Sequence, residues 1–287
     1  MWVGKFETGY DGATTTQEAE VNNVATDKIA IKSNIYSWRY ITLGNAFKNS
    51  YDYQRSLDSH MMKNTEWGAV TYLQHSNYGS HARVRTNNNS AYITGYSSTV
   101  EPTLGTSAES VEGNRHESTS LGVDGTYTIN YLNKNSAVSS TTGNYTGIYD
   151  MSGGSSEYVM GYTTGATTVG GSSEITSIYD NFFDDTTYTK YWDEYTSTSY
   201  YNYNNRILGD ATGELGPFGR NYAANGTTTY ASSSWYNTYS GLATSTYPWI
   251  LRGQYYASGI SAGITSFGYT KGETAYATYR IVLTPMS

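Results

Sequence analysis

The chain has 287 residues, enough for one large domain or two small ones; only 37% of them are hydrophobic, and Tyr (32) far outnumbers Phe (6). Lys and Arg (17) against Asp and Glu (24) leave a net charge of −7, and no basic stripe exists to neutralise phosphates, which excludes nucleic acid as an expected partner. The absence of Cys excludes disulfides, thiolate metal sites and Cys nucleophiles.

The N-terminal part of the chain predicts one strand and two helices. Alternating β-rich residues predict the strand over residues 2–8. The first helix follows an N-cap at Thr42, and its apolar stripe at i, i+3, i+4 and i+8 consists of Leu43, Ala46, Phe47 and Tyr51. The second helix begins at a cap on Asn64 or Thr65 and stops before Gly79, and its stripe consists of Trp67, Val70 and Leu73.

The rest of the chain predicts short strands separated by long polar loops. Residues 80–146 are rich in Ser, Thr, Asn and Gly, and we expect short strands only near 91–96 and 126–132. Three apolar bursts near the C-terminus predict the last antiparallel strands, at Ile250–Arg252, Ile264–Phe267 and Tyr279–Leu283. No apolar run approaches the roughly 18 residues that a membrane span needs.

Two phrases about a hundred residues apart carry a family resemblance: Gly147–Tyr158 (GIYDMSGGSSEY) and Pro248–Tyr256 (PWILRGQYY), with Tyr279–Leu283 (YRIVL) closing the chain. Together they resemble the signature of the formylglycine-generating-enzyme/sulfatase-modifying-factor family, a branch of the C-type-lectin-like fold. Trp2–Thr8 (WVGKFET) is similar to the first strand of that family, cut at its beginning, and Glu66–Leu73 (EWGAVTYL) is similar to its second helix.

The resemblance implies an α+β, C-type-lectin-like (FGE-sulfatase) fold, with low secondary-structure content, two helices packed on short antiparallel sheets, and long loops. We expect residues 1–287 to form a single such domain, the C-terminal part of a longer surface protein. Arg252 and Arg280 would be buried arginines that pair with carboxylates or carbonyls. The full set of scaffold residues implied by the resemblance is Arg252, Gly253, Gly263, Phe267, Arg280 and Glu157.

The departures from the family pattern exclude its oxidase chemistry. The generating enzyme uses a pair of reactive cysteines and copper, and this chain has no Cys. Gly154 and Ser156 stand where the family has Asn and Trp, so that only Glu157 and Tyr158 keep that part of the pattern. We therefore expect a protein that is not an enzyme.

Other catalytic and metal motifs are weak. Gly259–Gly263 (GISAG) matches a nucleophile elbow, but all four His precede Ser261 and no helical pattern follows it, so we interpret it as a Gly-rich turn in a sheet. No cofactor is expected apart from one open alternative. The acidic residues Asp180, Asp184 and Asp185 are weak candidates for a structural calcium site, because Ca²⁺ prefers carboxylate oxygens.

The C-terminal stretch is rich in Tyr, Ser and Thr, the mixture that antibody paratopes use for contact area and adaptable hydrogen bonds. It resembles the variable segment of proteins that are diversified by diversity-generating retroelements, which share the lectin-like fold. The ligand-binding residues predicted on this face are Tyr255, Tyr256, Ser258, Ser266, Tyr269, Thr270, Tyr276 and Thr278.

The expected function is that of a noncatalytic ligand-binding head, an adhesin or receptor-binding protein, on a bacterial or phage surface. Its ligand would be a protein or glycan on a cell surface, and the expected location is extracellular, at the cell surface or on a virion. The alternative is a structural subunit of an extracellular filament, pilus-like fibre or virion, in which the Tyr-rich surfaces mediate self-assembly.

Overall fold

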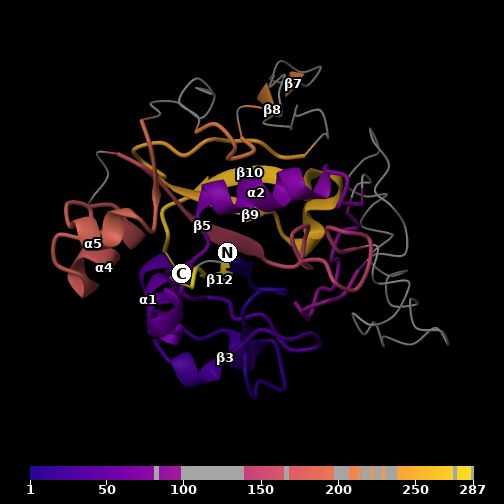
Figure 1. The fold of residues 1–287 in the computed structure, drawn as a ribbon, viewed down its shortest axis with the longest axis horizontal. Helices are drawn as coiled ribbons and strands as arrows, with labels where there is room; N and C mark the ends of the chain where they lie inside the picture. Colours follow the sequence, from indigo (N-terminus) through magenta and orange to yellow (C-terminus); the bar gives the residue numbers. More distant parts are fainter. Residues whose placement is uncertain are drawn as a thin grey trace.

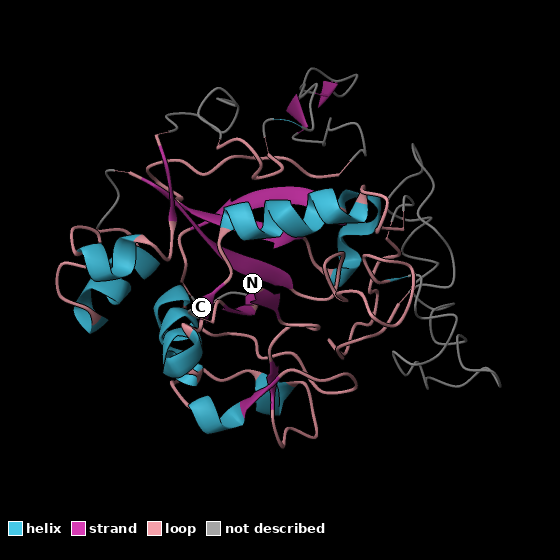
Figure 2. Cartoon of the chain, viewed as in Figure 1, coloured by secondary structure: helices cyan, strands magenta, loops and turns pink. Residues whose placement is uncertain are grey.

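The computed structural model describes residues 1–80, 84–97, 139–164, 168–196, 207–212, 214, 221–222, 228–229, 238–273 and 277–285. These residues form a mixed α/β structure of small sheets and short helices joined by long loops (Figures 1 and 2). The strands are β1 (Trp2–Val3), β2 (Gly9–Tyr10), β3 (Ile29–Ala30), β4 (His60–Met61), β5 (Ser156–Thr163), β6 (Asp193–Tyr195), β7 (Asn221–Tyr222), β8 (Thr228–Thr229), β9 (Trp249–Gly253), β10 (Gly263–Thr270), β11 (Ala277–Tyr279) and β12 (Ile281–Leu283).

The helices are short and lie around the sheets. The α-helices of the described residues are α1 (Leu43–Tyr53), α2 (Asn64–Gln74), α4 (Gly171–Ile178) and α5 (Thr186–Thr189). The 3-10 turns are η1 (Gln17–Ala19), η2 (Thr26–Lys28), η3 (Arg55–Leu57) and η7 (Tyr256–Ser261). None of the helices in the described ranges is long and apolar enough to cross a membrane.

The largest sheet has five strands and holds the C-terminal hairpin. Its order is β10-β9-β5-β11, with β9 antiparallel to both β10 and β5. The opposite edge of β5 pairs in parallel with β11 near Ser156 and with β6 near Thr163. A three-stranded sheet, β1-β12-β4, joins the two ends of the chain, which lie close together in Figure 1. Arg280 stands between β11 and β12 and therefore links the two sheets.

Both predicted helices form, and their starts show how the caps work. Thr42 is the N-cap of α1, where its hydroxyl accepts a hydrogen bond from the Asn45 amide, as predicted. At α2 the N-cap is Lys63, one residue before the predicted position, and its amide donates to the Glu66 carboxylate at 2.8 Å. The Asn64 side chain is directed elsewhere and donates to the Tyr195 hydroxyl.

The core lies on both faces of the five-stranded sheet. One cluster packs α1 and the α4–α5 segment against the sheet around Phe47, Tyr162 and Trp249. The other packs α2 over β9 and β10 around Trp67 and Phe267, the arrangement that Figure 1 shows. Six tyrosines are completely or almost completely buried in the core or next to it: Tyr149, Tyr158, Tyr162, Tyr191, Tyr195 and Tyr279. Tyr therefore takes the place of Phe and aliphatic residues in much of the interior.

The strand predictions are confirmed at the C-terminus and are only partly right elsewhere. The bursts at Ile250–Arg252 and Ile264–Phe267 form β9 and β10, whereas Tyr279–Leu283 divides between β11 and β12. The strand expected over residues 2–8 is only β1, and residues 91–96 contribute an isolated bridge at Ile93. The strand expected at 126–132 lies outside the described residues.

Candidate functional site

The predicted ligand-binding face does not form one surface. Tyr255, Tyr256 and Ser258 lie on the connection between β9 and β10, where η7 begins. Tyr269 and Thr270 are half-buried at the other end of β10, where they pair with Ile250 and Trp249 at the start of β9. Tyr276 lies outside the described residues. The residues near η7 are therefore the part of the predicted face that can act together.

Ser266 and Thr278 were wrongly predicted to lie on this face, because both are completely buried. Thr278 in β11 donates a hydrogen bond to the Thr8 carbonyl at 3.2 Å. Ser266 lies in an irregular part of β10, where the register with β9 shifts between Gly263 and Phe267. The α2 helix covers one side of β10, where Trp67 Nε1 donates to the Ile264 carbonyl at 2.6 Å. Together with the register shift, this covering helix disrupts the alternation of inward and outward residues in that part of the strand.

The residues near η7 belong to a larger group that we call the tyrosine–arginine cluster: Arg39, Tyr40, Tyr92, Tyr255 and Tyr256. The Arg39 guanidinium stacks on the Tyr92 ring, with 3.3 Å between its carbon and the ring centre, and lies 5.6 Å from the centre of the Tyr40 ring. Tyr92 packs against Tyr256 at 5.0 Å and 88°, and Tyr256 packs against Tyr255 at 5.7 Å and 88°. Burial raises the pKa of Tyr92 to about 12, so its hydroxyl stays protonated. The cluster thus extends from a buried cation to an exposed ring.

Exposure increases along this series of side chains. Arg39 is 3% exposed, Tyr92 is 8% exposed and Tyr255 is 41% exposed. Arg39 also pairs with Glu20, which neutralises its charge. Only the outer tyrosines can contact a ligand, and Arg39 and Tyr92 support them from below.

The backbone at the cluster is held in unusual conformations. Tyr40, Tyr92 and Gln254 have φ values of 55°, 54° and 59°, which bulky side chains rarely adopt. The Tyr256 amide donates to the Gly154 carbonyl at 2.9 Å, and the Gly153 amide donates to the Gly253 carbonyl at 3.2 Å. These bonds fix the start of η7 to the 150–157 segment. Such strain persists where the surrounding structure holds it and is typical of binding and switch regions.

The 150–157 segment ends in a buried ion pair. Arg280 and Glu157 are both completely buried, and Arg280 Nε donates to Glu157 Oε2 at 2.9 Å. Arg280 also donates to the carbonyls of Gly4 (2.7 Å) and Tyr149 (3.0 Å). Arg280 is therefore buried and paired as the sequence predicted, and it holds the N-terminal strand, the 150–157 segment and the C-terminus together.

Two more buried carboxyls surround the same arginine. Glu7 accepts hydrogen bonds from the Ser155 amide (2.9 Å) and the Ser37 hydroxyl, and burial, with the charges of Asp150 and Glu157, raises its pKa well above the usual value. Burial raises the pKa of Asp150 to about 6, although Arg280 opposes the shift. One arginine cannot neutralise three carboxylates, so Glu7 holds its proton to a higher pH than an exposed glutamate does.

The other predicted scaffold residues hold the base of the hairpin. Arg252 is completely buried, donates to the carbonyls of Asp210 and Ala211 at 3.3 Å, and lies 5.6 Å from the ring centres of Trp67 and Phe267. Burial lowers the pKa of Arg252 to about 10, so it remains charged at neutral pH. Gly253 has a φ of 78°, and a Cβ on Gly263 would lie 2.6 Å from Thr238 Cγ2. The positive φ at Gly253 and the close approach of Thr238 at Gly263 both favour glycine at these positions.

The metal and nucleophile candidates are not arranged as sites. Asp185 caps α5 by accepting from the Thr187 amide at 2.7 Å, whereas Asp180 and Asp184 are exposed in the preceding turn. The described part of the chain contains no group of three or more His, Asp or Glu residues that could hold a metal ion. Ser261 ends a 3-10 turn and is followed by β10, so the strand–turn–helix context of a nucleophile elbow is missing.

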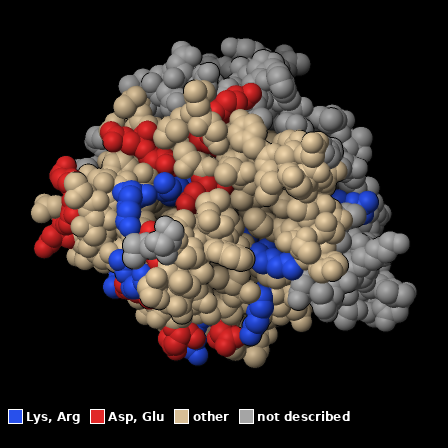
Figure 3. Space-filling view, viewed as in Figure 1, with Lys and Arg blue, Asp and Glu red and all other residues tan. Residues whose placement is uncertain are grey.

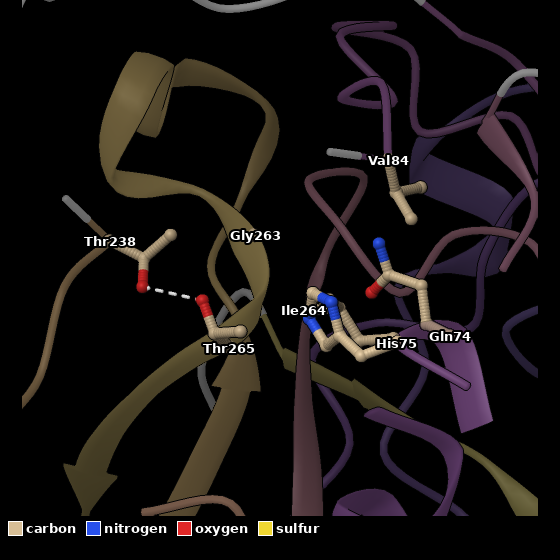
Figure 4. A pocket seen from close by; sticks show the side chains of 7 residues that line it. All are labelled: Gln74, His75, Val84, Thr238, Gly263, Ile264 and Thr265. Atoms are coloured by element: carbon tan, nitrogen blue, oxygen red, sulfur yellow. Dashed lines mark hydrogen bonds between the residues drawn. The ribbon is translucent and has the colours of Figure 1, made fainter. Parts of the chain in front are cut away.

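The best-defined cavity near the hairpin is too small for an organic ligand. Figure 4 shows it between the end of α2 and the start of β10, where Thr238 and Thr265 are hydrogen-bonded at 2.8 Å. Its volume is about 10 Å³, which is about what one water molecule needs. A more open pocket of about 540 Å³ at the start of α1 contains Glu174, which accepts hydrogen bonds from Thr42 and Gly44. Its described lining has no aromatic or large apolar side chain, so the surface near η7 is the better candidate for a ligand site.

Comparison of the sequence with models of known protein families gives no match, and comparison with curated proteins also gives none.

Three residues of the cluster were not predicted from the sequence. Arg39, Tyr40 and Tyr92 lie in irregular segments, more than 150 residues before the hairpin that Tyr92 contacts. No periodicity or motif marks them, because only the folded chain brings these segments together. The one signal in the sequence is an Arg-Tyr pair that directly follows a buried Trp38.

Proposed function

We propose that this chain is a noncatalytic ligand-binding head with a C-type-lectin-like fold, and that the tyrosine–arginine cluster is its ligand-binding surface. The observation that carries the proposal is the stack of Arg39, Tyr92, Tyr256 and Tyr255, which ends in an exposed ring on a strained and anchored loop. Tyr provides a large contact area at little cost in conformational entropy, and an anchored loop reduces that cost further.

The fold proposal is supported by the arrangement of the elements. Two helices, α1 and α2, pack on short sheets, long loops connect the strands, and the hairpin β9–β10 presents η7 at its end (Figure 2). The phrases that resemble the FGE-sulfatase family lie in this hairpin and in the 150–157 segment that anchors it. The absence of Cys supports a role other than the oxidation that the family enzyme performs.

The proposed location is the surface of a bacterium, a phage or another virion, and the proposed ligand is exposed on a cell. On the face shown in Figure 3, uncharged residues predominate and Lys and Arg lie among Asp and Glu. Solubility therefore depends on hydroxyl and amide groups, a composition common in extracellular β-rich proteins. Whether the hairpin is diversified is tested by the neighbouring DNA, where a reverse transcriptase gene and a near-copy of the codons for residues 250–283 are expected.

The test is flow cytometry of a panel of bacterial and animal cells with fluorescently labelled protein. The variant Tyr255→Ala/Tyr256→Ala is expected to lose binding by tenfold or more while its melting temperature changes little. The matched control, Tyr78→Ala/Tyr145→Ala, removes two rings that are 81% and 59% exposed in other loops, and it should bind normally. Equal binding by the wild type and the cluster variant would refute the proposed surface.

A structural subunit of a filament or virion is the second candidate. It is favoured by Trp2, which is 71% exposed on β1 at the edge of the three-stranded sheet, where another chain could pair. Gel filtration over a hundredfold range of concentration distinguishes the two functions. A constant monomer volume argues against the subunit, and a mass that increases with concentration and falls in Trp2→Ser supports it.

A further inference from the structure

The rings of the tyrosine–arginine cluster form a corner. Tyr256 meets Tyr255 at 88° and Tyr92 at 88°, so that adjacent rings are perpendicular. The face of an aromatic ring is electron-rich and attracts groups with positive partial charge. A sugar ring has such a surface, because its axial C–H groups lie on one face and its hydroxyls project around its edge. A corner of perpendicular rings can contact both the face and one edge of a sugar.

The electrostatics of the surface favour a neutral ligand. Residues 253–270, which include all of η7 and β10, contain no Lys, Arg, Asp or Glu. The nearest cation in the stack, Arg39, is buried and paired with Glu20. Gln254 and Ser258 next to the rings are half-buried and lie 3.4 Å apart, where Ser258 donates to the Gln254 amide oxygen. An amide and a hydroxyl match the hydrogen-bonding groups of a neutral sugar.

The size of the surface favours a small epitope over a protein. A stable protein–protein interface buries roughly 800 Å² on each partner and involves about 20–30 residues a side. The described surface at η7 offers four suitable side chains, because Ser266 and Thr278 are buried and Tyr269 lies at the other end of β10. Those four side chains are Gln254, Tyr255, Tyr256 and Ser258. One or two sugar rings fit this area.

We infer that the cluster binds a neutral glycan by stacking on Tyr255 and Tyr256, without a bridging calcium ion. The inference rests on the proposed function and specifies its ligand class. Calcium would need several oxygen ligands, with carboxylates among them, and residues 253–270 contain no carboxylate. A proline-rich peptide can also stack on aromatic rings, but it presents few hydroxyls to Gln254 and Ser258.

The experiment is binding of the labelled full chain to a printed array of neutral and acidic glycans, in 2 mM EDTA and in 2 mM CaCl2. In parallel, cells that bind the protein are treated with periodate, which cleaves vicinal diols, or with a protease. The inference predicts binding to neutral glycans that is equal in both buffers, is lost on periodate treatment, and falls tenfold or more in Tyr255→Ala and in Tyr256→Ala. Tyr255→Phe is expected to keep most of the binding, because the ring remains.

The outcomes separate this inference from the proposed function. Binding that needs CaCl2, or that is confined to acidic glycans, overturns the inference. Cell binding that depends on Tyr255 but is destroyed by protease and survives periodate also overturns it, while the ligand-binding function remains. Binding that is unchanged in both tyrosine variants overturns the proposed surface as well.

Discussion

Replacing Glu7 with Gln tests the electrostatics below the binding loop, and we expect the variant to be more stable than the wild type at alkaline pH. Glu7 is completely buried and shares Arg280 with Asp150 and Glu157. It accepts hydrogen bonds from the Ser155 amide and from the Ser37 hydroxyl. A Gln side chain can make both contacts, since its oxygen accepts and its nitrogen donates.

The sign of the effect follows from proton linkage. Burial raises the pKa of Glu7 and of Asp150 in the folded state, so between pH 4 and pH 6 the folded chain binds more protons than the unfolded chain. The stabilisation from these protons is fully present below the unfolded pKa values and is lost as the pH rises through the folded ones. For Asp150, the change from 3.8 to about 6 corresponds to about 3 kcal/mol. The pKa of Glu7 is shifted in the same direction.

Glu7→Gln removes the loss of stability with rising pH at one of these two carboxyl groups. We expect the free energies of unfolding of the variant and the wild type to agree within about 1 kcal/mol at pH 4.5, and the variant to be the more stable of the two at pH 8, because Gln carries no proton to lose. The difference in Tm between the variant and the wild type should therefore grow as the pH rises from 4.5 to 8. Circular dichroism melts at pH 4.5, 6, 7 and 8 measure it.

The control is Glu157→Gln, which removes the charge that pairs with Arg280. This change leaves a buried guanidinium without its main partner and should cost about 3–5 kcal/mol at pH 7 and 8, where Glu157 is charged. If Glu7→Gln is instead less stable than the wild type at pH 8, Glu7 is ionised in the folded chain and the reasoning is refuted.

Three further predictions concern local structure. Thr42→Ala should lower the free energy of unfolding by about 1 kcal/mol in a urea titration, because the hydroxyl caps α1 and donates to Glu174; an unchanged midpoint would show that the cap contributes nothing. Gly153→Ala should lower the free energy of unfolding by at least about 2 kcal/mol more than Gly12→Ala. Both glycines have positive φ, but only a Cβ at Gly153 would meet another atom of the protein, 2.3 Å away. Equal losses of stability in the two variants would contradict this contact. Ser266→Tyr should destabilise the chain by about 1–3 kcal/mol in thermal melts, whereas the stability of Ser258→Tyr should stay within about 0.5 kcal/mol of the wild type. The reverse order would show that the burial pattern is wrong.

The sequence predicted best the elements that are determined by residues close to one another in the chain. Thr42 and the apolar stripe of α1 depend only on neighbours within three turns, and both are confirmed. The start of α2 differs by one residue, because the Glu66 carboxylate bonds to the Lys63 amide while Asn64 contacts Tyr195 from a distant strand. Tertiary contacts of that kind are not visible in a local pattern.

The candidate site was predicted only in part, for two physical reasons. Alternation of inward and outward residues assumes a strand with one solvated face, but β10 is covered by α2 and by residues 238–241, which buries Ser266. The inner half of the cluster comes from Arg39, which stacks on Tyr92, and from Tyr92, which packs against Tyr256; both contacts exist only after folding. Tyr255 and Tyr256 were predicted because they lie in the Tyr-, Ser- and Thr-rich stretch that follows the family-like Arg252-Gly253 pair.

The most direct test of the central claim is calorimetric titration of the full chain with the neutral glycan that binds best on the array. The account predicts a measurable Kd in EDTA, a Kd at least tenfold weaker for Tyr255→Ala/Tyr256→Ala, and a Tm for that variant within about 2 °C of the wild type. A Kd that is identical for the variant and the wild type would contradict the account.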